Sequence, residues 1–391
     1  AATLLLLVAL AAAGAGAQRL FAADGPIIVA QDGSGHHATI GEAIAAAEAG
    51  DEILVEVGTY AESITIDKDI TLRGEDRDSV VLELTDAVLV TLAESNGEVA
   101  DLKLRGDAST QGMTVQGGAP TITNVTFDGT GRPWNGEFCL EDESCGVSLV
   151  LDGTDAQVIG NRFLAGGEIG VHAGSTAVIE DNVFEGGPHI YLESIGPDVV
   201  VRGNHISGTL DRGIGMSSAG SVLIEDNLIS PAQGVGIRVG RTTGAMGYEP
   251  TIRGNTIEGA DYGIEVTEGG EPVIEGNTFS DNSIAVSATQ AASEIRGNTL
   301  MESNTGLLLG AGDHVVTDNT ITGGRAGITT TGGAAQLSGN TVEGASNRGI
   351  AIGSDASPVL RDNRACGNGE NVWVADTAKP DIDDSNEICE D

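Results

Sequence analysis

The stretch that decides the fold is Ile252-Arg-Gly-Asn255-Thr-Ile257, which returns as Ile295-Arg-Gly-Asn298-Thr-Leu300. A unit of the same kind, aliphatic-x-x-Asn-x-apolar, recurs over most of the chain, and such self-similarity marks a repeat architecture. Its asparagine occupies ten positions at intervals of 21 to 23 residues, with one interval of 28: Asn161, Asn182, Asn204, Asn227, Asn255, Asn277, Asn298, Asn319, Asn340 and Asn363.

A second apolar element, Gly-aliphatic-x-aliphatic, follows many of these units, as in Gly236-Ile-Arg-Val239 and Gly263-Ile-Glu-Val266. Period-two alternation in both elements is typical of short strands, with Gly, Asn and Asp at the turns. One coil cannot bury its apolar face alone, but coils stacked about 4.8 Å apart form continuous parallel sheets around one aliphatic core. The sequence therefore predicts an all-β, single-stranded right-handed parallel β-helix.

The repeated asparagine has a structural explanation. A turn-facing amide can hydrogen bond its copy in the coils above and below, which forms a ladder along the stack. In the earlier segment Ile122-Thr-Asn-Val125-Thr-Phe127 the aligned position holds Val125, so we expect the ladder to begin near Asn161. We favour this role over a catalytic one for these asparagines.

Before the repeat, residues 38–47 have apolar residues at helical spacing. A helix here would cap the N-terminal end of the stack and shield its strand edges. Three segments carry a family resemblance: Val29-Ala-Gln-Asp-Gly-Ser-Gly35, Ala38-Thr-Ile-Gly-Glu-Ala-Ile44, and Gly58-Thr-Tyr-Ala-Glu62 followed by Leu72-Arg-Gly74. They resemble the N-terminus of pectin methylesterases and related proteins of the pectin lyase-like superfamily, and this resemblance implies a pectin lyase-like solenoid.

The catalytic segments of pectin methylesterases are missing. That family uses two carboxylates within Gln-Asp-Thr-Leu-like and Asp-Phe-Ile-Phe-Gly-like segments, and neither occurs in this chain. We therefore expect no pectin methylesterase activity and interpret the resembling segment as a shared cap.

The chain is strongly acidic, with a formal net charge of −39 from 58 acidic and 19 basic residues among 391. Nucleic acid is excluded as a partner, because binding phosphates requires basic patches. Such a surface suits a protein of a salty environment or simply an acidic secreted protein.

Residues 1–17 contain Leu4-Leu-Leu-Leu-Val8 and end in Ala15-Gly-Ala17, which indicates a signal peptide truncated at its start. The run is too short to span a bilayer. We expect a secreted protein, extracellular or periplasmic, without membrane insertion and monomeric. Its β-helix domain would cover residues 18–375 and its acidic tail residues 376–391.

Secretion permits disulfides. Cys139 and Cys145 bracket a short loop, and Cys366 and Cys389 could tie the tail to the last coil. Zinc binding is the rival interpretation, but neither a CxxC pair nor clustered histidines support it.

In a Gly-aliphatic-x-aliphatic strand the residue between the aliphatics points outward, and successive coils align these residues in a row. His189 and Glu193 flank Tyr191 on the same face, and Asp211 and Arg212 lie at the mouth of the next coil. Titratable residues concentrate between His172 and Glu265. The predicted row reads Ser148, His172, Tyr191, Gly215, Arg238, Glu265, Ala285, Leu308, Thr329, Ala351 and Trp373.

Two insertions bracket these strands and could wall a groove for a chain-like ligand. Residues 128–144 carry Trp134, and residues 241–249 carry Arg241 and Tyr248. The candidate catalytic residues are His172, His189, Tyr191, Arg212 and Arg238. The candidate substrate-binding residues are Trp134, Glu193, Arg241, Tyr248 and Glu265.

These residue types suit a lyase or C-5 epimerase of a uronate polymer, which needs a cation for the carboxylate, a base and an acid. Arg212 or Arg238 would neutralise, and His172, His189 or Tyr191 would exchange protons. Pro188-His189 with Tyr191 resembles the Pro-His segment of mannuronan epimerases, although Gly187 stands where that family has Asp.

No cofactor is required by these residues, although a Ca²⁺ ion could be held by carboxylates such as Glu193, Asp211 and Glu265. Two function classes stay open. One is a secreted enzyme that acts on an extracellular polysaccharide. The other is a non-catalytic surface or periplasmic β-helix that binds or scaffolds.

Overall fold

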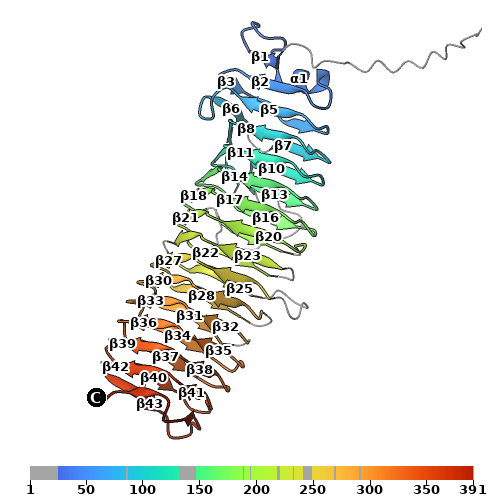
Figure 1. The fold of residues 1–391 in the computed structure, drawn as a ribbon. Helices are drawn as coiled ribbons and strands as arrows, with labels where there is room; N and C mark the ends of the chain where they lie inside the picture. Colours follow the sequence, from blue (N-terminus) through green and yellow to red (C-terminus); the bar gives the residue numbers. More distant parts are fainter. Residues whose placement is uncertain are drawn as a thin grey trace, which may run out of the picture.

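The computed structural model is an elongated right-handed parallel β-helix (Figure 1), which confirms the predicted fold class. It describes residues 25–84, 87–131, 147–187, 189–193, 195–217, 221–231, 233–240, 249–267, 270–289 and 292–390. Three parallel sheets run along the stack, and each coil contributes one strand to each sheet in turn.

Sheet A has 16 described strands. They are β1 (Ile27–Val29), β2 (Glu52–Val55), β5 (Thr71–Gly74), β8 (Glu98–Ala100), β11 (Thr121–Thr123), β14 (Gln157–Ile159), β17 (Val178–Glu180), β20 (Val199–Arg202), β23 (Val222–Glu225), β26 (Thr251–Arg253), β29 (Val273–Glu275), β32 (Glu294–Arg296), β35 (Val315–Thr317), β38 (Gln336–Ser338), β41 (Val359–Arg361) and β44 (Asp381–Ile382).

Sheet B has 15 described strands. They are β3 (Gly58–Tyr60), β6 (Val80–Glu83), β9 (Lys103–Arg105), β12 (Thr126–Asp128), β15 (Arg162–Leu164), β18 (Val183–Glu185), β21 (His205–Ser207), β24 (Leu228–Ser230), β27 (Thr256–Glu258), β30 (Thr278–Ser280), β33 (Thr299–Met301), β36 (Thr320–Thr322), β39 (Thr341–Glu343), β42 (Arg364–Cys366) and β45 (Glu387–Ile388).

Sheet C has 14 described strands. They are β4 (Ile64–Ile66), β7 (Val88–Ala93), β10 (Gln111–Gln116), β13 (Leu149–Asp152), β16 (Ile169–His172), β19 (Ile190–Leu192), β22 (Arg212–Met216), β25 (Val235–Val239), β28 (Tyr262–Val266), β31 (Ile284–Ala288), β34 (Thr305–Leu309), β37 (Ala326–Thr330), β40 (Arg348–Ile352) and β43 (Glu370–Val374).

The core is a continuous column of inward side chains. In the coil that holds Asn255, for example, Ile252, Ile257 and Ile264 are fully buried, one from each sheet. Burial of one such side chain contributes about 1.5–3 kcal/mol. In sheet B the rings of Phe127, Phe163 and Phe184 stack with centroid separations of 4.5 and 4.7 Å. Neighbouring coils therefore supply the apolar contacts that a single coil lacks.

The corner between sheets A and B explains the Asn motif. The residue before each of the ten repeat asparagines is Gly or Asp in the left-handed region, such as Gly254 at φ 65° and Asp318 at φ 56°. Gly adopts this region freely and Asp tolerates it. The following asparagine then turns its amide into the stack.

The asparagines form the predicted ladder. From Asn182 onward, each Oδ1 accepts from the backbone N–H and the Nδ2 of the asparagine one coil earlier, as Asn298 does from Asn277 at 2.9 and 3.0 Å. The first rung is the Val125 N–H on Asn161 Oδ1 at 2.9 Å, which confirms the predicted start. Asn386, which the repeat search did not include, adds a last rung by accepting from Asn363.

One short helix, α1 (Ile40–Ala46), lies beside β1, β2 and β4 near the N-terminal end of the stack. The Thr39 side chain caps it by accepting from the Glu42 N–H at 3.2 Å. The Glu62 carboxylate accepts from the Ile40 and Gly41 N–H groups, each at 3.0 Å. Among the described residues no helix is long and apolar enough to span a membrane.

The C-terminal end of the stack is held by the Cys366–Cys389 disulfide, as predicted. Strands β44 and β45 pair with β41 and β42, so residues beyond 375 extend sheets A and B. The disulfide bond engages both sulfurs, so Cys366 and Cys389 offer zinc no thiolate. Cys139, Cys145 and residues 1–17 lie outside the described residues.

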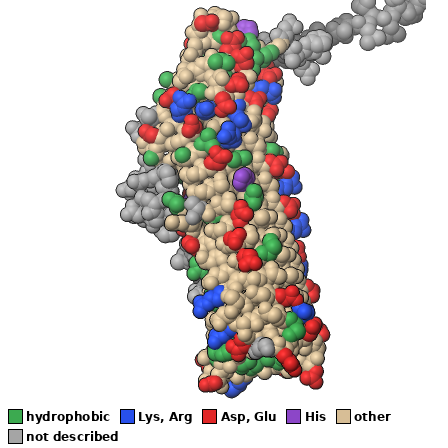
Figure 2. Space-filling view, turned by 90° about the vertical axis from the view of Figure 1, so that its left-hand side faces the viewer, with side chains coloured by type: hydrophobic (Ala, Val, Ile, Leu, Met, Phe, Trp, Pro, Cys, Tyr) green, Lys and Arg blue, Asp and Glu red, His purple; other side chains and the backbone are tan. Residues whose placement is uncertain are grey.

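Charges pair extensively on the outer surface. One column of sheet A alternates acidic and basic residues over six coils, and the pairs Arg202–Glu180, Arg253–Glu225 and Arg296–Glu275 are 2.8, 2.6 and 2.6 Å apart. Figure 2 shows one face of the stack, where acidic side chains are spread with basic ones among them. Most of the few basic groups are thus already engaged within the chain.

The strand register corrects the predicted outward row. Tyr191, Gly215, Arg238 and Glu265 do share one column of sheet C. Ser148 and Ala285 do not belong to it, because they are 1% and 0% exposed. At those coils the column holds Val150 and Ser287.

His172 also lies outside this column. In β16 the outward position is Gly170, and His172 is two residues further on, in register with Asp152 and Glu193. The shift arises because β16 reads Ile-Gly-Val-His. In strands such as β25 and β28 the glycine stands two residues before the outward position, whereas in β16 the glycine itself is outward, so an alignment counted from glycine is displaced by two residues. Because two residues restore the same face, His172 still points outward.

Candidate functional site

The candidate site lies on the outer face of sheet C, from β16 to β28. Its most enclosed contact joins two adjacent coils, where His189 Nε2 lies 2.9 Å from Glu168 Oε2. The two residues precede Ile169 and Ile190, which are paired in register. The His189 side chain is only 5% exposed and that of Glu168 25%. The pair is therefore an imidazole and a carboxylate shielded from most solvent.

Opposing effects set the protonation of Glu168. Burial alone would raise the pKa of its carboxyl, but the hydrogen bond from His189 and the electrostatic influence of His189, His172 and Arg212 outweigh it. The pKa of Glu168 is therefore below its ordinary value, and the group is a carboxylate at neutral pH.

Two glycines shape the surface around Tyr191. A Cβ on Gly170 would lie 2.5 Å from His172 Nε2, and one on Gly215 would lie 2.5 Å from Arg212 Cδ. Real Cβ atoms essentially never come this close to a non-bonded heavy atom, so each side chain can lie over its glycine only because the glycine has no Cβ. They flank Tyr191 from the coils above and below.

The planar groups form one strip along the stack. The rings of His172 and Tyr191 have centroids 6.5 Å apart with their planes at 63°. On the other side the Arg212 guanidinium carbon is 5.7 Å from the Tyr191 centroid, within the range of a cation–π contact. We call His172, Tyr191 and Arg212 the planar strip.

Tyr191 is a proton donor in this setting. Its hydroxyl donates to Ser217 Oγ at 2.9 Å. Burial raises the pKa of the Tyr191 phenol, and the negative charges of Glu193 and Glu168 add to this, while the Ser217 bond and Arg212 act against it. The net pKa is above the ordinary value, so the phenol keeps its proton at neutral pH.

Both arginines of the site are paired with carboxylates of the chain. Arg212 contacts Asp211, and Arg238 lies 2.7 Å from Glu265 and 3.8 Å from Asp211. His172 Nδ1 is 3.8 Å from Glu193 Oε2, where both side chains are partly exposed. A uronate carboxylate arriving here must compete with three carboxylates already present.

Seven of the ten predicted site residues thus lie along one face over neighbouring coils: His172, His189, Tyr191, Glu193, Arg212, Arg238 and Glu265. Trp134, Arg241 and Tyr248 lie outside the described residues. Glu168 was missed, although its position before an inward isoleucine matches that of His189 one coil later. Comparing those two strand entries in the sequence would have found it.

The described residues do not gather the predicted calcium ligands Glu193, Asp211 and Glu265. Within the described ranges, the one set of three such residues with ligand atoms inside 4.8 Å is Cys366, Glu387 and Cys389. The two sulfurs of that set are bonded to each other. This set therefore offers a metal one carboxylate and no thiolate.

A family model described as right handed beta helix region matches residues 145–300 and 283–388. No curated protein sequence matches the chain. The fold is similar to the catalytic unit of a thermostable GH87 α-1,3-glucanase from Streptomyces thermodiastaticus strain HF3-3, with a TM-score of 0.52 and 16% identity over 88% of this chain and 64% of that one.

It is also similar to tailspike protein 3 of bacteriophage CBA120, with a TM-score of 0.51 and 15% identity over 88% of this chain and 57% of that one. A double mutant of the periplasmic alginate epimerase AlgG gives a TM-score of 0.48 and 13% identity over 83% of this chain and 78% of that one. The chain spans less than two thirds of the glucanase unit and of the tailspike. At these identities the similarity concerns the fold.

Proposed function

The chain belongs to the right-handed β-helix family, and from this premise we propose that it binds or acts on an extracellular polysaccharide along the outer face of sheet C. The observation that carries the proposal is the planar strip beside the shielded Glu168–His189 pair. Flat groups at successive coils offer a sugar chain a surface that runs parallel to the stack. The similar Streptomyces protein is a glucanase, which agrees with a polysaccharide ligand.

The more specific proposal is a lyase or C-5 epimerase of a uronate polymer. His189, held by Glu168, supplies a base for the proton beside the carboxylate. In a lyase the C4–oxygen bond then breaks and the leaving oxygen takes a proton, which the Tyr191 phenol can donate. In an epimerase the acid instead returns a proton to the opposite side of the same carbon.

The test uses the full chain with alginate, pectate and a neutral glucan, with and without Ca²⁺ and salt. Ultraviolet absorbance detects unsaturated ends, and NMR detects a changed ratio of uronates. If the proposal holds, His189→Gln and Tyr191→Phe each lower the rate by about 10²–10⁴-fold. Thr329→Ala, further along the same column, is the matched control and leaves the rate unchanged. Absence of turnover on every polymer would reject the enzyme.

A non-catalytic binding or scaffolding protein is the second candidate. The observation that favours it is that both arginines of the site already pair with carboxylates of the chain, Arg212 with Asp211 and Arg238 with Glu265. Neither guanidinium is then available to neutralise a uronate carboxylate. In this case binding of the polymer would survive His172→Ala and His189→Ala. Loss of binding in these variants with intact folding would argue for the enzyme instead.

Three further expectations belong to this proposal. We infer that α1 shields the edge of β1 and its neighbours, because it lies against β1, β2 and β4. We also infer that residues 1–17 direct secretion to an extracellular or periplasmic location and that the protein is a monomer there. Fusing residues 1–24 to a reporter enzyme tests export, and light scattering of the purified chain tests its mass.

A further inference from the structure

A second polar feature lies on the same side of the stack, at the corner where the chain enters sheet C. A shallow hollow of about 480 Å³ opens there, over the coils that carry β31, β34, β37 and β40. Its lining includes Ser283, Asn304, Arg325 and Ser346, with Asp281 and Glu302 at its rim. None of these residues belongs to the site around Tyr191.

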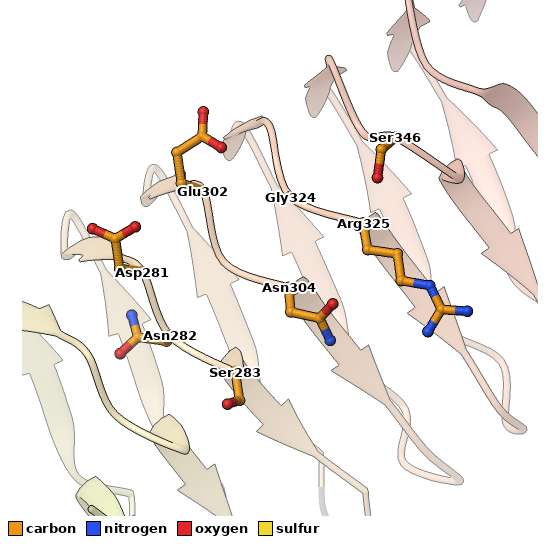
Figure 3. A pocket seen from close by; sticks show the side chains of 8 residues that line it. All are labelled: Asp281, Asn282, Ser283, Glu302, Asn304, Gly324, Arg325 and Ser346. Carbon is orange, nitrogen blue, oxygen red and sulfur yellow. The ribbon is translucent and has the colours of Figure 1, made fainter. Parts of the chain in front are cut away.

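The hydrogen-bond donors Asn304 and Arg325, which line this hollow, point in the same direction. In Figure 3 the side chains of Asn304 and Arg325 project side by side from neighbouring coils, away from the carboxylates of Asp281 and Glu302. The Glu302 side chain instead folds over Gly323, where a Cβ would lie 2.5 Å from its Oε1. The backbone holds the two donors in register, because the Arg325 N–H donates to the Asn304 carbonyl at 3.1 Å.

Arg325 differs from the arginines of the site around Tyr191. Within the described part of the chain it makes no ion pair, whereas Arg212 and Arg238 each contact a carboxylate. An exposed guanidinium beside an amide and two hydroxyls is a donor set suited to an acidic group, which guanidinium can bind through two parallel hydrogen bonds. Here such a group meets no carboxylate already bound to the cation.

The spacing sets the size of the ligand. Tyr191 lies in β19, and Arg325 directly precedes β37. These two strands are six steps apart in sheet C. At about 4.8 Å a step, this separation is roughly 29 Å. A monosaccharide or disaccharide cannot span it, but an extended chain of several sugars can.

We propose that this hollow is a subsite for an acidic substituent of the polysaccharide, a carboxylate or a sulfate ester, bound by Arg325 and Asn304. The proposal rests on the proposed function and specifies its ligand as an acidic polymer that extends from Tyr191 along the stack.

The experiment measures binding of the full chain by affinity electrophoresis at two salt concentrations. The probes are alginate and pectate for the carboxylate, dextran sulfate for the sulfate ester, and a neutral glucan. Arg325→Gln is expected to weaken binding of one acidic class roughly tenfold or more and to reduce its salt dependence. Arg325→Lys restores part of the loss, and Asn304→Ala weakens binding less. Uronate oligomers too short to reach from Tyr191 to Arg325 should bind Arg325→Gln as tightly as the unaltered chain.

The matched control is Arg202→Gln, which removes the same charge from the outer face of sheet A. If Arg325→Gln loses no more affinity than this control, the subsite is refuted while the polysaccharide function stands. If the protein binds only the neutral glucan, the acidic ligand is refuted. If it binds no polymer at all, both the proposed function and the subsite fail.

Discussion

Replacing one rung of the asparagine ladder with a side chain that cannot hydrogen bond should destabilise the coils around it more than any surface change. In Asn298→Ala the Asn277 N–H and Nδ2 lose their shared acceptor, and the Ile274 carbonyl loses a donor at 2.9 Å. The bond from Asn298 Nδ2 to Asn319 Oδ1 disappears as well.

The magnitude follows from burial. Asn298 is 1% exposed and Asn277 is equally buried, so water cannot readily replace these partners. A buried polar group without a partner costs about 1–3 kcal/mol, and at least two groups are left in that state. The expected loss in free energy of unfolding is therefore about 2–6 kcal/mol. Because contacts in a solenoid are between neighbours, the loss should be local at first.

Two measurements check this. Guanidinium unfolding followed by far-ultraviolet circular dichroism gives the change in stability, and hydrogen exchange with mass spectrometry locates it. Thr299→Ala, the outward residue next in the chain, is the matched control and should change stability by less than about 0.5 kcal/mol. Exchange of the Asn277 amide should rise in Asn298→Ala alone. Equal stability of the two variants would refute the structural role of the ladder.

Three further predictions concern other parts of the chain. His314 is fully buried, its two ring nitrogens have no partner among the described residues, and burial lowers its pKa despite the opposing charge of Asp313. The unfolded chain therefore binds the proton more readily, so stability falls as pH drops below about 6.5, and His314→Leu should flatten this loss in unfolding experiments at pH 7.5 and 5.5. Gly215→Ala should displace Arg212 from Tyr191 and weaken polymer binding, while circular dichroism stays unchanged; unaltered binding would mean that the planar strip is not used. Reduction of Cys366–Cys389 should speed proteolysis of residues 367–390 and leave the rest of the stack resistant, as limited digestion can show.

The repeat made the fold predictable because one local rule operates at every coil. A left-handed Gly or Asp followed by an inward amide fixes the corner, and Val125 marked where the ladder begins. The repeat search missed Asn386 because Ser385 precedes it, whereas Gly or Asp precedes the ten repeat asparagines.

The site was predictable only to the level of its face. The outward row was misplaced at Ser148, His172 and Ala285, because the phase of a strand was counted from a glycine that does not always hold the same position. Ala285 occupies the glycine position of its coil, and Gly170 occupies the outward one.

Partners were harder to predict than positions. The importance of Glu168 and Arg325 depends on residues one coil away. Glu168 pairs with His189, and Arg325 is left without an ion pair among the described residues because the Glu302 carboxylate lies over Gly323 instead. Sequence periodicity places a residue on a wall of the stack, but it does not say which groups are already engaged. The roles of Trp134, Arg241 and Tyr248 stay predictions.

The Cys366–Cys389 bond gives the stack a mechanical direction. It links the last coil covalently to the one before it, so tension applied at that terminus bypasses the residues between the two cysteines and cannot extend them. Pulled from both termini, the oxidised molecule should retain this closed loop while the rest of the stack extends, and the reduced one should extend further by the length of the loop.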